Sequence, residues 1–349
     1  MHECGAGASF GAVSGHHRAA SPRPTSKPLP LKTTAFVSHE DGPRHDTGWS
    51  HPDHQGRLPG IVRAVYRDMV ALFEPLLEVE AVPATVDDLL LVHTPAHVER
   101  VRAASARAQA DGAVLEVDGV KLSGASWDAA LAAAGAGITA AGCLLRGDAR
   151  NAFCLVRPSG RGARPDSAGG FSLFDNVGIT ARRLRRSGTG RVLIVDLGVR
   201  PSTTARTVAG DDGIACVSVH QHTTSVPVGD GDVQRPGSVP PERWIAVHPG
   251  SSGAELGDAL RSVLDAIPPA EEPDIVLLAL DLGILAGDPF GGLAVTPDEV
   301  YGITRVIRDW ADAHARGRLV SILDGGYAPD GLGRAVVQHL RALTGLQPA

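Results

Sequence analysis

The sequence RVLIVDLGVR, residues 191–200, carries the strongest structural signal in the chain. Four apolar residues, 192–195, lead into Asp196, and such a continuous apolar run is typical of a parallel strand buried on both faces. In open α/β sheets, ligands bind at the carboxyl ends of such strands. The residues that follow are unusual for a binding edge. Gly198 has no side chain, and Arg200 offers only hydrogen-bond donors and a permanent positive charge.

Short apolar segments of this kind alternate with helical patterns from residue 33 onward. Strands are expected at 35–38, 152–156, 192–196, 215–220, 244–247, 275–281 and 319–323. Helices are expected at 58–73, 95–104, 126–146, 175–186, 254–267, 297–315 and 330–343. This alternation predicts a single α/β domain, with a central, mainly parallel sheet and helices on both faces.

The composition limits the possible functions. The chain has 349 residues, of which 43% are hydrophobic and 21% charged, as in ordinary globular proteins. The net charge of −6 and the pI near 6.1 give no overall attraction to nucleic acid. We expect no membrane span, because no apolar run reaches the roughly 18 residues required. The four cysteines have no metal-ligand spacing, and the cytoplasm is the expected compartment.

The domain boundaries follow from local composition. Residues 1–32 are rich in Gly, Ala, Ser and Pro and cannot bury a core, so a disordered tail is expected there. A signal peptide is not expected, since the tail has no apolar central region. The folded domain is expected at 33–345, followed by a short C-terminal tail at 346–349.

Eight segments in register resemble one known family. They are RHDTGWSHPDHQGRL (44–58), LLVHTPAHVERV (90–101), SGASWDAALAAAGAG (123–137), LVRPSGRGA (155–163), GGFSLFDNVGITA (169–181), VSVHQH (217–222), GDPFGGLAVT (287–296) and ILDGGYAPDGL (322–332). Together they resemble the histone deacetylase / acetylpolyamine amidohydrolase family, which has the arginase–deacetylase fold. The resemblance implies that fold for residues 33–345, and it implies zinc-dependent amide hydrolysis as the ancestral reaction.

The same resemblance places the three zinc ligands of the family on residues that do not bind zinc. The Asp-x-His pair falls on Gly198 and Arg200, and the second Asp falls on Gly283. The general-base His-His pair falls on Arg161 and the glycine after it, and arginine takes up no proton at neutral pH. A shift of register brings Asp281 near the third position, but zinc needs three protein ligands. The sequence therefore predicts no zinc and no deacetylase activity.

Two further residues match catalytic positions of the family. Tyr327 matches the tyrosine that donates a hydrogen bond to the developing oxyanion, although a packed tyrosine is an equally good interpretation. Asp196 matches a carboxylate that orients a base histidine. Because Arg161 replaces that histidine, we expect a buried, bidentate salt bridge between Asp196 and Arg161 that fills the old site.

Four residues are candidates for contacting a ligand. Arg157 is retained from an Arg-Pro turn, and Phe171 matches a wall of the acyl channel or belongs to the core. Asp46 lies in the loop that rims the family's pocket, or is a solvated loop charge. His220 fits a Ser-x-His strand, and with His222 it forms an H-x-H pattern that lacks a third metal ligand.

A monovalent cation is a separate matter. The resemblance implies that potassium is held near a strand-end aspartate and a strand serine, which Asp196 and Ser218 match. Potassium is therefore allowed at this place, with Arg200 as a competing occupant of the same space.

Two hypotheses for function remain, decay without function is a third possibility, and an active zinc-dependent deacetylase is the least supported interpretation. The first is a non-catalytic binding or regulatory module. The second is a metal-independent enzyme for an anionic or carbonyl-containing small molecule, in which Arg161, Arg200 and Tyr327 act on the substrate. A pocket filled by Arg–Asp pairing indicates the module, whereas an open pocket lined by arginines indicates the enzyme. The sequence predicts neither the ligand nor the oligomeric state.

Overall fold

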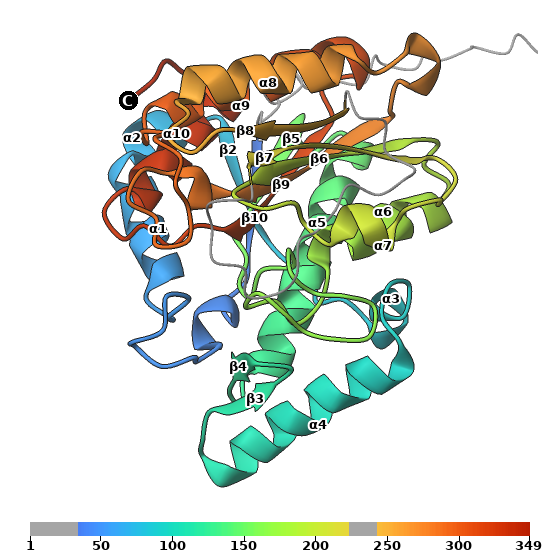
Figure 1. Cartoon of the computed structure of the whole chain (residues 1–349), viewed down its shortest axis with the longest axis vertical. Coiled ribbons are helices and arrows are strands. Elements are labelled where there is room, and N and C mark those ends of the chain that lie inside the picture. Colours follow the sequence, from blue (N-terminus) through green and yellow to red (C-terminus); the bar gives the residue numbers. More distant parts are fainter. Residues whose placement is uncertain (1–33, 223–242) are drawn as a thin grey trace, which may run out of the picture. The chain divides into compact units, whose positions relative to one another are not determined.

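An eight-stranded sheet forms the centre of the computed structural model, which describes residues 34–222 and 243–349 (Figure 1). The strand order is β2-β1-β5-β10-β9-β6-β7-β8, and every neighbouring pair is parallel. The strands are β1 (Thr34–Ser38), β2 (Leu76–Glu80), β5 (Asn151–Cys154), β6 (Val192–Gly198), β7 (Ile214–Gln221), β8 (Trp244–Val247), β9 (Ile275–Asp281) and β10 (Leu319–Gly325). A separate antiparallel hairpin joins β3 (Leu115–Val117) and β4 (Val120–Leu122).

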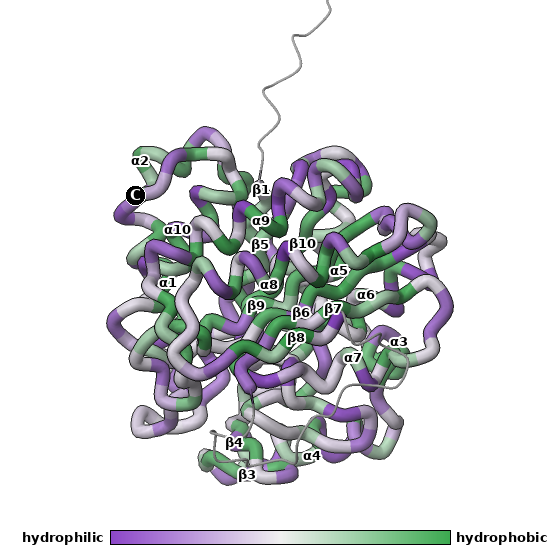
Figure 2. Tube along the Cα trace, turned by 45° about the horizontal axis from the view of Figure 1, so that its top comes forward, coloured by the Kyte–Doolittle hydropathy of each residue, from purple (hydrophilic) through white to green (hydrophobic). Residues whose placement is uncertain are grey.

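Helices cover both faces of the sheet. The helices are α1 (Arg57–Arg67), α2 (Met69–Leu72), α3 (Val86–Leu89), α4 (Pro95–Asp111), α5 (Ser126–Arg146), α6 (Asn176–Arg186), α7 (Thr204–Thr207), α8 (Gly253–Asp265), α9 (Glu299–His314) and α10 (Leu332–Thr344). One core packs α1, α8, α9 and α10 against the sheet, and a second core packs α5 and α6 against the opposite face. Figure 2 shows the hydrophobic segments concentrated along the central strands.

Strand residues alternate between the two cores, as the pleat of a sheet requires. On β6, Leu193 and Val195 belong to the first core and Ile194 to the second, and all are at most 1% exposed. This double burial explains why the central strands read as continuous apolar runs rather than as alternating ones. The predicted α/β architecture with a parallel sheet is confirmed.

Helix α5 corrects one expectation about apolar length. Its 21 residues are long and apolar enough for a membrane-spanning helix, whereas no apolar segment of that length is expected from the sequence. In the structure, 67% of its apolar window is buried, and small residues such as Ala133 and Ala140 pack in the core with β5. Helix α5 is therefore a core helix of the domain.

The predicted strands and helices all occur, most with shifts of one to three residues at their ends. Helix α4 extends seven residues beyond its predicted end at 104, and the helix predicted at 58–73 is divided into α1 and α2. The prediction did not include β2, the β3–β4 hairpin and the one-turn helices α3 and α7. Strand β2 has the sequence LLEVE and lies at the edge of the sheet, where only alternate residues are buried. Such a short edge strand lacks the continuous apolar run that identifies the central strands. The predicted tail at 1–32 lies outside the described residues.

Candidate functional site

The carboxyl ends of three adjacent strands bring three aspartates together. Asp196 lies on β6, Asp281 ends β9, and Asp324 lies near the end of β10. These strands are neighbours in the order β10-β9-β6, so their ends share one edge of the sheet. The exposed fractions of Asp196, Asp281 and Asp324 are 0%, 6% and 1%. Burial of three carboxylates requires compensating charge or hydrogen bonds.

The guanidinium of Arg161 supplies that charge. Its Nη1 atom lies 2.8 Å from Asp196 Oδ1 and 3.6 Å from Asp324 Oδ2, and its Nε atom lies 3.3 Å from Asp281 Oδ2. Its Nη2 atom donates a hydrogen bond to the backbone carbonyl of Arg200 at 2.7 Å. The Arg161 side chain is 11% exposed, so all four contacts lie within the protein. One cation therefore serves three buried anions.

Asp196 is also held by its own strand edge. Its Oδ2 atom accepts hydrogen bonds from the backbone N–H of Ser202 at 2.8 Å and from the hydroxyl of Ser218 at 3.1 Å. The remaining oxygen faces Arg161. Both oxygens of this carboxylate are thus engaged, which keeps it in one orientation.

Backbone amides orient the other two carboxylates. Asp281 accepts from the N–H of Val199 at 3.2 Å and from that of Gly283 at 2.8 Å. Asp324 accepts from the N–H of Gly160, the residue before Arg161, at 2.7 Å. These bonds hold the carboxylates in place around the guanidinium.

Three glycines leave the space that this cluster occupies. A Cβ atom on Gly198 would overlap Nη2 of Arg161 and would lie 2.8 Å from the Cβ of Asp281. A Cβ atom on Gly283 would lie 2.9 Å from Asp281 Oδ1, and one on Gly325 would overlap that oxygen. Any larger residue at position 198 therefore displaces the Arg161 guanidinium.

The expected Arg161–Asp196 pair is therefore present, but its predicted form is wrong. The contact to Asp196 goes through Nη1 alone, because Nε faces Asp281 and Nη2 faces the carbonyl of Arg200. The guanidinium bridges several partners instead of forming a bidentate pair with one. Arg200 itself is partly buried and contributes its backbone carbonyl to the cluster.

Arg157 has a structural role, which corrects its assignment as a substrate-binding residue. Its Nε donates to Asp53 Oδ1 at 3.0 Å, its Nη1 donates to the carbonyls of Gly42 and His45, and its Nη2 donates to Thr47 Oγ1 and the Asp53 carbonyl. These bonds use all five donors of the guanidinium, and the residue is 1% exposed. Arg157 thus fixes the N-terminal loop and has no donor left for a ligand.

Tyr327 lies in an aromatic cluster with Phe171 and Phe290. The three ring centroids are 5.4 to 5.6 Å apart with edge-to-face geometry, which is the preferred packing of aromatic pairs. The Arg57 guanidinium lies 4.6 Å from the centre of the Tyr327 ring. Burial raises the pKa of the Tyr327 hydroxyl well above its usual range, opposed in part by a hydrogen bond with Ser159. The three rings are thus in contact where the resemblance expects the acyl channel, and Tyr327 also lines a groove beside α1 and α10.

The two remaining candidates have partners within the protein. The Asp46 carboxylate accepts from the N–H of Gly48 at 2.8 Å and shapes its own loop. His220 is 5% exposed, and its Nδ1 lies 3.0 Å from the Ser218 hydroxyl. Burial lowers the pKa of His220 to about 4, so the ring is neutral at pH 7. His220 therefore behaves as a core histidine. Potassium binding beside Asp196 and Ser218 stays a prediction.

Burial also changes the acidity of the cluster. It raises the pKa of Asp324 to about 7, although the charge of Arg161 and the N–H of Gly160 act in the opposite direction. One guanidinium therefore does not keep all three carboxylates fully ionised near neutral pH.

This shift predicts how stability depends on pH. Because the folded-state pKa of Asp324 lies above its unfolded value of about 3.9, the folded protein binds this proton more tightly. The stability that the protonated group contributes is complete below about pH 4 and is lost as pH rises to about 7. Between pH 5 and 7.5, the free energy of unfolding of the wild-type protein should therefore fall by about 1–3 kcal/mol more than that of Asp324→Asn.

Urea unfolding at several pH values measures this difference. Asp265→Asn, a substitution at an exposed position, is the matched control and should follow the wild-type curve. Parallel pH curves for wild type and Asp324→Asn would show that Asp324 does not titrate in this range.

The residues at the expected zinc positions do not fit a zinc ion. Gly198 and Gly283 provide no side-chain ligand, Arg200 provides only donors, and the Arg161 guanidinium takes the space next to Gly198. Within residues 34–222 and 243–349, no group of three or more His, Cys, Asp or Glu side chains is arranged to hold a metal ion.

Two members of the cluster were not assigned from the sequence. The motifs indicate Asp281 only as a zinc ligand displaced by a register shift, and they include Asp324 only as part of the segment before Tyr327. Their positions at the ends of apolar strands were the available signal, because adjacent parallel strands place their end residues at one edge. Asp324 in particular follows Leu319–Leu323, a mostly apolar run with one serine, much as Asp196 follows residues 192–195.

Comparisons with known proteins agree with this fold. The histone deacetylase domain model matches residues 51–343. A "Probable deacetylase" of Archaeoglobus fulgidus is 26% identical over 85% of this chain and 82% of its own length. "Histone deacetylase 18" of Arabidopsis thaliana is 31% identical over 73% of this chain, which spans only 39% of that protein. The crystal structure of the HDA15 HD domain superposes with a TM-score of 0.80 at 25% identity, covering 92% of this chain and 91% of that one.

Proposed function

The chain belongs to the histone deacetylase family, and we propose that it is a non-catalytic member in which an arginine–carboxylate cluster replaces the zinc site. The observation that carries this proposal is the position of Arg161. Its guanidinium is the cation at the strand edge, and Asp196, Asp281 and Asp324 surround it. In the family that edge binds zinc. Here a fixed side-chain charge takes the place of the metal charge and balances the buried acids.

The fit between the glycines and the cluster supports a maintained structure rather than random decay. Gly198 and Gly283 are the expected ligand positions, and a side chain at either would collide with Arg161 or Asp281. The absence of a ligand side chain at position 198 and the presence of Arg161 are therefore sterically coupled. Such coupling is expected when a folded arrangement has been kept, because each part is needed by the other.

The alternative, a metal-independent enzyme, receives less support. It requires arginine donors that face an open pocket, but Nη1, Nη2 and Nε of Arg161 all have partners within the protein. It also requires a reactive hydroxyl on Tyr327, whose ring packs against Phe171 and Phe290 and whose pKa is raised by burial. Of the two arginines that this enzyme would use, Arg161 is buried in the cluster, and Arg200 is partly exposed. We therefore favour a binding or regulatory module over this enzyme.

The same proposal includes a compartment. Cys143, Cys154 and Cys216 are free and buried, which is typical of proteins in a reducing environment. We therefore propose the cytoplasm as the location of the protein.

Metal content and activity test the proposal. The full-length protein, purified without added metal, is expected to hold far less than one zinc per chain by elemental analysis. It should release no acetate from acetyl-lysine peptides or acetylpolyamines with or without added zinc. A zinc-dependent family member assayed in parallel shows that the substrates and conditions support turnover.

Two outcomes would overturn the proposal. About one tightly held zinc with chelator-sensitive activity would point to missed ligands, and Asp281 with the His220/His222 pair should then be substituted first. Metal-independent turnover that is lost in Arg200→Ala, with the fold retained, would instead favour the enzyme hypothesis.

A further inference from the structure

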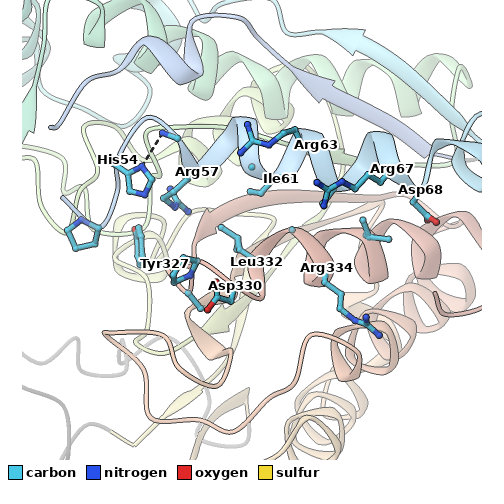
Figure 3. Close-up of a pocket in the computed structure, with 18 residues that line it drawn as sticks. His54, Arg57, Ile61, Arg63, Arg67, Asp68, Tyr327, Asp330, Leu332 and Arg334 are labelled. Atoms are coloured by element: carbon cyan, nitrogen blue, oxygen red, sulfur yellow. Dashed lines mark hydrogen bonds between the residues drawn. The ribbon is translucent and has the colours of Figure 1, made fainter. Parts of the chain in front are cut away.

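A groove of about 640 Å³ lies between α1 and α10, outside the arginine–carboxylate cluster (Figure 3). Its base is apolar, with Ile61 on α1 and Leu332 on α10 both almost fully buried. The two helices approach closely here, since a Cβ atom on Gly333 would lie 2.7 Å from the Cβ of Ala64. Arg63 and Arg67 stand along the α1 wall of the groove.

Most charges around the groove are already balanced. Arg57 pairs with Asp53, and Arg334 pairs with Asp298 at 2.6 Å. The groove residue Asp68 is held by Arg341, whose Nε and Nη2 each lie 2.7 Å from one of its oxygens. Outside these pairs stand Arg63 and Arg67 on the α1 wall and one exposed carboxylate, Asp330, in the segment before α10.

Arg63 and Arg67 have no acidic partner among the residues that the structure describes. They are four residues apart on α1, so they share one face of the helix, and both are exposed. Three residues after Arg67, the side chain of Val70 is 100% exposed. A pair of uncompensated guanidiniums is thus followed by a solvent-exposed apolar residue, on a chain whose net charge is −6.

We propose that this groove binds an acidic peptide segment of a partner protein. Two carboxylates of the segment pair with Arg63 and Arg67, and an adjacent apolar side chain contacts Val70 or the apolar base of the groove. Guanidiniums suit carboxylates because their donors match the two oxygens. A groove between two rigid helices suits an extended or helical peptide. This inference does not depend on whether the arginine–carboxylate cluster is catalytic.

Fluorescence anisotropy with a defined probe tests the proposal. The probe is a fluorescein-labelled peptide, GEEDLEEL, and the comparison peptide is GQQNLQQL, which has the same length and no carboxylate side chains. The full-length protein should bind the acidic probe at least about tenfold more tightly than the neutral one, with affinity that falls as salt is raised.

Charge reversal locates the binding site. The double variant R63E/R67E should weaken binding of the acidic probe by about tenfold or more. The matched control is R186E/R206E, which changes the net charge by the same amount at exposed positions on α6 and α7. This control should stay within about twofold of wild type, and thermal unfolding should show that both variants remain folded.

Three results would overturn the proposal. The first is no preference of the wild-type protein for the acidic probe. The second is an equal loss of affinity in both double variants, which would indicate a general charge effect. The third is binding to vesicles of phosphatidylcholine with 30% phosphatidylserine that is lost in R63E/R67E while neither peptide binds. That result would assign the face to a membrane surface.

Discussion

Arg161→Ala is expected to lower the free energy of unfolding by about 3–5 kcal/mol, the usual cost of removing one partner from a buried ion pair. The substitution leaves Asp196, Asp281 and Asp324 facing one another without a cation. Three carboxylates grouped around one point cannot all remain ionised without a cation, so they must take up protons or admit water. The loss should therefore be larger at pH 8 than at pH 5.

Urea unfolding followed by circular dichroism measures both effects. Arg186→Ala, at an exposed position at the end of α6, is the control and should change stability by less than about 0.5 kcal/mol. Arg161→Lys keeps the charge but not the planar set of donors, so an intermediate loss is expected. If Arg161→Ala were as stable as the control at pH 8, the guanidinium would not be the cation that balances the cluster.

The pairing of Arg161 with Asp196 could be predicted because it depends on one rule. Parallel strands place their carboxyl ends at one edge of the sheet, and the loop after β5 returns to that edge. The family resemblance then placed Arg161 opposite Asp196. Both inferences require only the order of strands and loops, which periodicity and motif spacing reveal.

The full set of partners could not be predicted in the same way. The orientation of Arg161 toward Asp281 depends on the space left by the missing side chains of Gly198 and Gly325. A periodic sequence pattern does not reveal such free volume. Arg157 shows the same limit. An Arg-Pro motif does not reveal that the N-terminal loop supplies an acceptor for each of its five donors.

Composition gave a poor indication of local aromatic content. Aromatic residues make up only 4% of the chain. The structure instead places Phe171, Phe290 and Tyr327 in mutual contact, with His51 beside Phe171 at 4.6 Å between ring centroids. An average over 349 residues says nothing about where the few rings gather. Here they gather around Phe171, which the family resemblance assigns to a wall of the acyl channel.

The second large effect is expected for Gly198→Ala. The new Cβ atom would overlap Nη2 of Arg161 and crowd the Cβ of Asp281. The guanidinium must therefore move away from its carboxylates, and overpacking adds to the loss of the ion pairs. We expect the free energy of unfolding to fall by about 3–5 kcal/mol, a large effect for one added methyl group. Gly302→Ala is the matched control, because a Cβ atom there meets nothing within 4 Å on the exposed side of α9.

Combining the two substitutions separates this steric cause from a general loss of backbone freedom. In an Arg161→Ala background the guanidinium is absent, so Gly198→Ala should cost only about 1 kcal/mol, which is due to the remaining contact with Asp281. The coupling between the two positions should then be about 2 kcal/mol or more. Additive effects within about 0.5 kcal/mol would mean that the two residues do not compete for the same space. Strong coupling would mean that an arginine at 161 and a ligand side chain at 198 exclude each other. Regaining a metal ligand at position 198 would then require the loss of Arg161 as well.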